Sequence, residues 1–203
     1  MPMEVNMTPD RPGHCAAGRL PKLSYQQSDE WVAHSHPATF RTEVTSAGST
    51  RVVAGVPAGD PLTFQRLAES LEAPFMLLYV LHTPRGEGEA GRYQSPSLSL
   101  GEAQAFLEQH AAFLSGDARF DLWIHSPGEN ATVIWDRHNL IHAYGPTGRY
   151  VSTLKALGFE EGSPNLAFAH MHHYRQEFDN EAAAVLQAFA WRHSPLQAED
   201  EQR

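Results

Sequence analysis

Cysteine is almost absent from this chain, which has a single one, Cys15, among 203 residues. One thiol can form neither an intramolecular disulfide nor a cysteine-based zinc site, so a disulfide-stapled secreted scaffold is excluded. Apolar runs are short, since the longest extends from Phe75 to Leu81 and a bilayer span needs ~20 residues. The N-terminus also lacks the continuous apolar stretch of a secretory signal. We therefore expect a cytoplasmic protein without a membrane partner.

Positive charge is scarce as well. The 15 Lys and Arg residues face 24 acidic ones, which gives a formal net charge of -9. An acidic surface repels phosphate backbones, so the composition argues against nucleic-acid binding and suits a basic protein partner, or simply solubility. The hydrophobic content of 41% and charged content of 19% are typical of a folded domain. The chain is long enough for one ordinary domain with tails.

Signatures of nucleotide binding and nucleophilic catalysis are missing too. The chain has no G-x-S-x-G nucleophile elbow and no P-loop. Residues 86–91 match G-x-G-x-x-G, but Pro96 separates them from the next helix, whose N-terminus would have to hold the pyrophosphate. We interpret residues 83–98 instead as a surface loop, either a lid or merely flexible. Its candidate partner-binding side chains are Arg85, Arg92 and Tyr93.

What the sequence does contain is a clear strand pattern in Phe120–Tyr144. Turn signals at residues 127–130 and 136–139 divide it into three apolar strands and predict a β-meander. If both turns are tight four-residue turns, Val133 lies opposite His142. Alternation then points His125 and His142 to opposite faces of the sheet, so they should not share a metal ion.

Local signals mark the helices. Asp60 as N-cap and Pro61 at the first helical position predict one helix. Ser99 and Glu102 have the spacing of a capping box and predict a second, to about residue 115. Two more helical patterns follow the meander.

The order of these elements predicts the fold class. Local hairpins between the helices favour an α+β domain with a mainly antiparallel sheet, a central meander at about residues 120–144 and about four packed helices. We assign this single domain to residues 39–192. Residues 1–38 are predicted to be a mobile N-terminal arm, and residues 193–203 a polar C-terminal tail.

Histidine is abundant, with 12 residues, and supplies the main candidate for chemistry. His170 and His172 project from one face of an expected strand, about 6–7 Å apart along the backbone, where they can converge on a divalent metal. His173 points to the other face. Glu177 and Asp179 follow in the next turn and supply oxygen ligands for a two-histidine, one-carboxylate site that suits zinc, nickel or iron.

Other histidines are interpreted without a metal. His34 and His36 have the spacing of two ligands on one strand face, but Pro37 follows directly, so we interpret them as surface residues of the arm. Asp136-x-His138 lies in an expected tight turn, and turn chemistry alone explains its residues.

Two functions from different classes fit these observations. The first is a non-catalytic binding or adaptor module for a protein partner, for instance an immunity-like protein that neutralises a basic toxin. It rests on the missing catalytic signatures and the acidic balance. The second is a metal-dependent enzyme with a site on the His170-x-His172 strand. Whether the chain is an enzyme stays open at this point.

Overall fold

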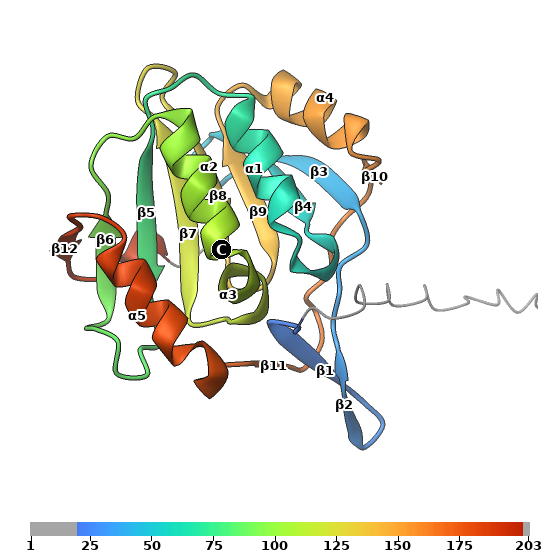
Figure 1. The fold of residues 1–203 in the computed structure, drawn as a ribbon. Coiled ribbons are helices and arrows are strands. Elements are labelled where there is room, and N and C mark those ends of the chain that lie inside the picture. The colour runs from blue at the N-terminus through green and yellow to red at the C-terminus, as the bar shows by residue number, and fades with distance from the viewer. Residues whose placement is uncertain (1–19, 201–203) are drawn as a thin grey trace, which may run out of the picture.

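The structure, a computed structural model, describes residues 20–200. Figure 1 shows a large twisted sheet with helices packed across one face and a small, separate sheet at its lower end. The predicted α+β class, with a mainly antiparallel sheet, is confirmed.

The large sheet has nine strands, and the meander lies at its centre as predicted. Every neighbouring pair is antiparallel except the first, which is parallel. In spatial order the strands are β10 (Glu160–Glu161), β3 (Thr39–Val44), β4 (Thr50–Gly55), β9 (Leu140–Tyr144), β8 (Ala131–Trp135), β7 (Phe120–Ser126), β5 (Met76–Leu81), β6 (Gly91–Gln94) and β12 (Arg192–Ser194).

The register of the meander differs from the prediction after its second turn. Val133 pairs with Ala143, and His142 pairs with Ile134, one residue away from the expected partner. The turn is longer because Asn139 adopts a left-handed conformation, with φ of 57°, which adds one residue to the hairpin. The shift moves His142 to the face of the sheet that carries His125, so their predicted separation onto opposite faces is wrong.

Five helices of residues 20–200 cover the other face, and two of the predicted starts, at Asp60 and Ser99, are confirmed. The Asp60 carboxylate accepts a hydrogen bond from the Leu62 amide at 3.1 Å, and Ser99 and Glu102 form the capping box. The helix expected over residues 99–115 is divided at His110, whose ψ of 11° ends one helix before the next begins. The helices are α1 (Pro61–Glu69), α2 (Leu100–Gln109), α3 (Ala111–Gly116), α4 (Thr147–Ala156) and α5 (Asp179–Gln187).

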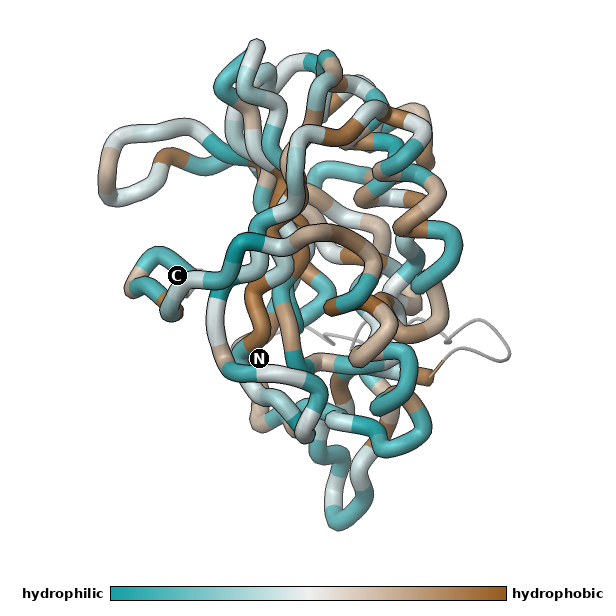
Figure 2. Tube along the Cα trace, turned by 60° about the vertical axis from the view of Figure 1, so that its left-hand side comes forward, coloured by the Kyte–Doolittle hydropathy of each residue, from teal (hydrophilic) through white to brown (hydrophobic). Residues whose placement is uncertain are grey.

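The core lies between these helices and the sheet. Phe64 of α1 and Tyr150 of α4 are fully buried in the same cluster as Trp135 of the central strand. The indole N–H of Trp135 donates to the Asn139 side-chain oxygen at 3.1 Å, so the second turn of the meander is tied to the core. Figure 2 shows hydrophobic residues concentrated in the interior, whereas the projecting loops are mostly hydrophilic.

The small sheet contains three strands in the order β11 (His170–His172), β1 (Leu23–Gln27) and β2 (Glu30–Ala33). The predicted mobile arm is therefore ordered over residues 23–27 and 30–33, where it forms β1 and β2, while residues 1–19 lie outside the described part. β1 (LSYQQ) and β2 (EWVA) are too short to show a sustained apolar alternation, and β2 is mostly exposed. Main-chain pairing, not a large apolar face, holds them. The expected strand over residues 165–174 is reduced to β11.

The predicted loop and tail are also ordered in part. Residues 91–94 of the loop form β6, and residues 192–194 form β12, which pairs with β6. A 3-10 turn at Ala198–Asp200 follows, and two more lie at Pro57–Gly59 and Gln176–Phe178. Residues 201–203 of the tail lie outside the described part. None of the helices in residues 20–200 has both the length and the apolar character that a bilayer crossing requires.

Candidate metal centre

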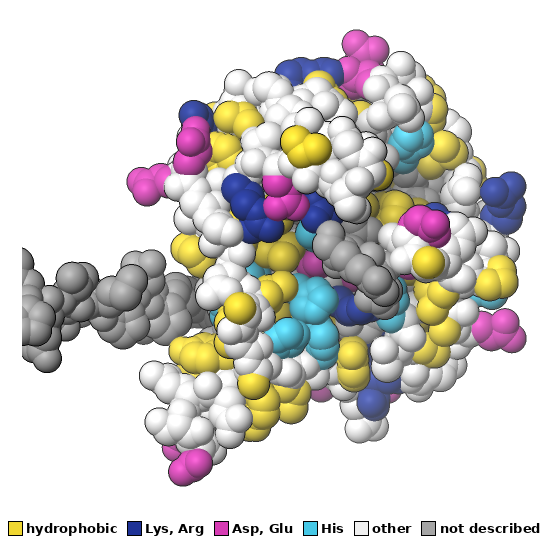
Figure 3. All heavy atoms as spheres, turned by 180° about the vertical axis from the view of Figure 1, so that it is seen from behind, with side chains coloured by type: hydrophobic (Ala, Val, Ile, Leu, Met, Phe, Trp, Pro, Cys, Tyr) yellow, Lys and Arg dark blue, Asp and Glu magenta, His cyan; other side chains and the backbone are white. Residues whose placement is uncertain are grey.

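Three histidines from two distant parts of the chain meet where the small sheet touches the large one. His138, His170 and His172 each offer one ligand nitrogen, and these three atoms all lie within 4.8 Å of one another. The rings are half-buried, with centroids 4.9 to 5.5 Å apart. Figure 3 shows histidine side chains gathered on the face opposite the helices. This group lies close enough together to bind a metal ion.

Local structure explains how the three residues meet. His170 and His172 pair with Tyr25 and Leu23 of β1, and strand alternation directs both imidazoles to one side of β11. His138 lies in the turn between β8 and β9. His36, only 1% exposed, donates from Nε2 to the main-chain oxygen of His138 at 2.9 Å, which holds this turn against the segment that follows β2.

Hydrogen bonds orient two of the rings for metal binding. Nδ1 of His138 lies 3.3 Å from the Asp136 carboxylate, and Nδ1 of His170 lies 3.0 Å from the main-chain oxygen of Phe168. Both oxygens are acceptors, so each Nδ1 carries the hydrogen and leaves the Nε2 lone pair available. Ligating histidines in metal sites are commonly held in this way. Nε2 of His172 is buried and has no hydrogen-bond partner within residues 20–200.

Asp136 supplies a buried negative charge behind the cluster. It accepts the main-chain N–H groups of His138 at 2.9 Å and Leu140 at 2.8 Å, and lies 3.2 Å from Nε2 of His142. Burial alone would raise the pKa of this carboxyl, but the hydrogen bonds from His138 and His142 hold it well below its usual range. Asp136 is therefore a carboxylate at neutral pH and favours a cation nearby.

Burial keeps His34 and His172 in the neutral form. Nε2 of His34 lies 3.4 Å from Nδ1 of His36, and the His34 ring packs against Phe168. Burial, and then repulsion from neighbouring histidines, lowers the pKa of His172 to about 3 and that of His34 to about 4. Neutral imidazole is the form that binds metals.

The interpretation of His36 as a surface residue is wrong, because the ring is buried.

These pKa values give the metal-free protein a pH-dependent stability. Both rings protonate near pH ~6.5 in the unfolded chain but only at much lower pH in the folded one, so the unfolded state binds more protons between these limits. We expect the free energy of unfolding, measured in urea with EDTA, to fall from about pH 7 to about pH 5. Because both rings are partly exposed to solvent, each should contribute well under the limit of about 1.4 kcal/mol per pH unit that holds for one proton. His172→Gln should reduce this slope. Equal slopes in both proteins would contradict the prediction.

The structure brings together only two of the four residues that the sequence suggested as ligands. His170 and His172 are in the group, but Glu177 and Asp179 are not. Asp179 instead accepts from Arg85 at 3.0 Å and from Arg119 at 3.1 Å. Glu177 is exposed.

The third member of the group, His138, was assigned only a turn role from the sequence. The one local indication that His138 could bind a metal was the Asp136 carboxylate, two residues before it in the sequence. His173 lies away from the group, with Nε2 2.7 Å from the Ser24 hydroxyl.

The loop residues proposed to hold a partner are engaged inside the molecule. Arg85 pairs with Asp179, and Arg92 contacts Gln197 and lies 3.4 Å from Asp200. The Tyr93 hydroxyl donates to the main-chain oxygen of Glu89 at 2.7 Å. These contacts hold both ends of the loop against the body of the domain.

The fold and the site define an α+β domain with a three-histidine cluster close enough to bind a metal ion. No family model, no curated protein and no solved structure matches the chain. The chemistry of the site is therefore interpreted from its own geometry. An all-imidazole ligand set suits zinc, copper, iron or nickel.

Proposed function

We propose that this protein binds a divalent transition metal through His138, His170 and His172, and that it is a metal-dependent hydrolase. The observation that carries the proposal is the convergence of three ligand nitrogens within 4.8 Å, two of them oriented through Nδ1. Three protein ligands that leave a fourth position for water are the pattern of catalytic zinc sites, whereas structural sites are closed by four.

The chain's own residues have distinct tasks in this proposal. His138, His170 and His172 hold the ion, which when bound acts as a Lewis acid and lowers the pKa of a coordinated water toward about 7. Asp136 keeps the His138 ring in its orientation and adds negative charge, which raises the basicity of that ligand. The Phe168 carbonyl likewise keeps the His170 ring in its orientation, but it adds no full negative charge.

Metal analysis tests the proposal directly. Protein purified without a histidine tag should contain or take up about one zinc, nickel or iron ion per chain, the single-ion stoichiometry of a three-ligand site with one open position. His138→Ala and His172→Ala should each lose this metal and any metal-dependent hydrolysis of chromogenic esters. His125→Ala is a matched control, because His125 bonds to Thr132 on the same sheet face outside the group.

Two further variants separate this site from the one that the sequence suggested. Glu177→Gln should retain full metal content, because Glu177 lies outside the histidine group. Cobalt substitution should give the absorption of a four-coordinate site with nitrogen ligands. A protein that binds no metal at neutral pH, or one that loses it in the His125 or Glu177 variant, would contradict the proposal.

The adaptor hypothesis remains a prediction. The side chains offered for it, Arg85, Arg92 and Tyr93, all make contacts within the molecule, so no specific geometry supports a partner at that loop.

A further inference from the structure

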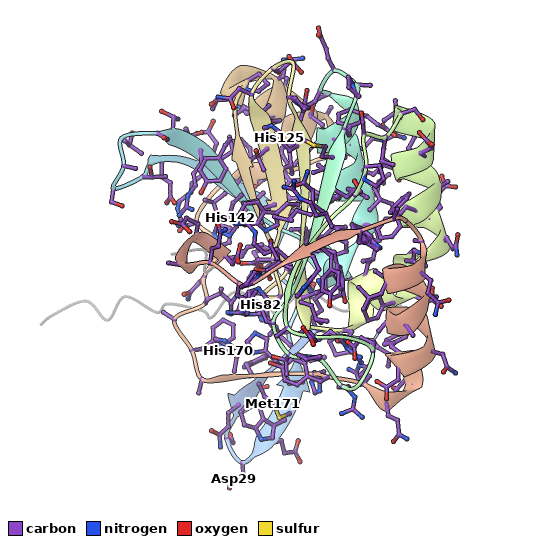
Figure 4. All side chains as sticks on the ribbon, turned by 90° about the vertical axis from the view of Figure 1, so that its left-hand side faces the viewer. Asp29, His82, His125, His142, His170 and Met171 are labelled. Atoms are coloured by element: carbon purple, nitrogen blue, oxygen red, sulfur yellow. The ribbon has the colours of Figure 1, made fainter. Side chains whose placement is uncertain are left out.

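A cavity lies on the helix-free face of the large sheet, away from the histidine cluster. Its volume is about 330 Å³, and its floor is formed by β5, β6, β7 and β8. The C-terminal segment that begins with β12 makes one wall. Figure 4 shows His125, which lines this cavity, near one end of the strands and His170 near the other.

The charge of this cavity is opposite to that of the chain. The protein has a formal net charge of -9, yet two arginines and no acidic residue line the cavity. Arg92 is balanced from behind by Asp200, whose side chain is 1% exposed. Arg192 pairs with no carboxylate within residues 20–200, and its guanidinium reaches only the Gln94 side-chain oxygen, at 3.4 Å. Among residues 20–200, the cavity therefore has one arginine without a carboxylate partner.

An aromatic surface lies beside these cations. Trp123 lines the cavity, and the guanidinium carbon of Arg92 is 5.8 Å from its ring centroid. The indole nitrogen of Trp123 is buried without a hydrogen-bond partner within residues 20–200. The Gln94 side-chain N–H group bonds only to the sulfur of Met76, at 3.5 Å, and a thioether is a weak acceptor. Within residues 20–200, one buried N–H donor of the cavity thus has no acceptor, and a second, partly exposed one has only a weak acceptor.

We propose that this cavity binds a small organic anion that carries a flat aromatic ring. The ring would pack on Trp123 and the aliphatic side chains of β5, and the oxyanion would pair with Arg192. The size fits, because a cavity of about 150 Å³ accommodates benzene and ligand pockets start near about 300 Å³. Unpartnered buried donors are costly, and an oxyanion supplies the acceptors that this cavity lacks.

Four probes test the two halves of the ligand. Benzoate and phenyl phosphate carry both the ring and an oxyanion, as carboxylate or phosphate, whereas benzamide has only the ring and acetate only the charge. Binding is measured by calorimetry and by ligand-observed NMR, in EDTA so that no anion binds through a metal ion. We expect benzoate or phenyl phosphate to bind at least tenfold more tightly than benzamide or acetate.

Variants locate the binding. Arg192→Gln should weaken the better probe by roughly tenfold, the effect of losing one charge-assisted pair. Trp123→Leu should weaken the aromatic probes and leave acetate unchanged. Lys155→Gln is the matched control, because it removes one positive charge from an exposed helix position. No binding of any probe at millimolar concentration, or binding that both cavity variants leave unchanged, would overturn the proposal. The histidine cluster is untouched by these variants, so this result is independent of the metal proposal.

Discussion

Replacing Asp117 by Ala is expected to lower the free energy of unfolding by roughly 3–5 kcal/mol, because it leaves a buried guanidinium without its main partner. Arg119 is completely buried and donates to Asp117 from Nε at 2.8 Å and from Nη2 at 2.9 Å. Asp117 also accepts the main-chain N–H groups of Arg119 at 3.0 Å and Arg175 at 2.8 Å. The substitution therefore removes four hydrogen bonds and one buried charge together.

Urea denaturation and thermal melting measure this loss. For a domain of this size, Tm should fall by roughly 6–20 °C. Arg85→Gln is the control, because it breaks a more exposed ion pair with Asp179, and such pairs contribute about 0–1 kcal/mol. A variant at position 117 that unfolds within about 1 kcal/mol of the unchanged protein would contradict the expectation.

Zinc is expected to stabilise the protein by connecting its two sheets. His170 and His172 belong to the small sheet, while His138 belongs to the turn between β8 and β9 of the large one. A ligand that binds only the folded state adds about 2.7 kcal/mol at a free concentration of about 100 times Kd. The unfolded chain cannot match this affinity, because 31 residues lie between His138 and His170 in the sequence, and an unfolded chain does not hold the three ligands together.

Thermal melting and hydrogen exchange test this coupling. With saturating zinc, Tm should rise by roughly 5–10 °C, and amide exchange should slow most in β1 and β11. His138→Ala should abolish both effects although it leaves His170 and His172 in place. If zinc stabilises this variant as much as the unchanged protein, the metal binds elsewhere.

Much of the fold could be predicted from the sequence because its signals are local. The capping box of Ser99 and Glu102 and the N-cap at Asp60 depend on residues a few positions apart, and both are confirmed. Apolar alternation likewise located the meander. The left-handed conformation of Asn139 has no comparably strong local signal, since asparagine tolerates it without requiring it. That single residue changed the face on which His142 lies.

The candidate site could be predicted only in part, for the same reason. The spacing of His170 and His172 is visible in one strand, but His138 joins them only through the docking of the small sheet. That sheet was missed, because β1 and β2 are short strands held mainly by main-chain pairing and show no sustained apolar alternation. The carboxylates Glu177 and Asp179 are close to these histidines in the sequence, but Asp179 forms ion pairs with Arg85 and Arg119 instead of joining the histidine group.

The two outermost strands of the large sheet are also its shortest, since β10 and β12 have two and three residues. An edge strand exposes unpaired main-chain groups, onto which a strand of another molecule can add. Here the long, apolar strands β5 and β7 lie inside the sheet. The border strand β10 pairs with only Thr39 and Phe40, so within residues 20–200 the rest of β3 remains an open edge. The order of the strands thus keeps the most apolar strands away from intermolecular strand pairing, and leaves the second half of β3 as the segment where a strand of another molecule can add.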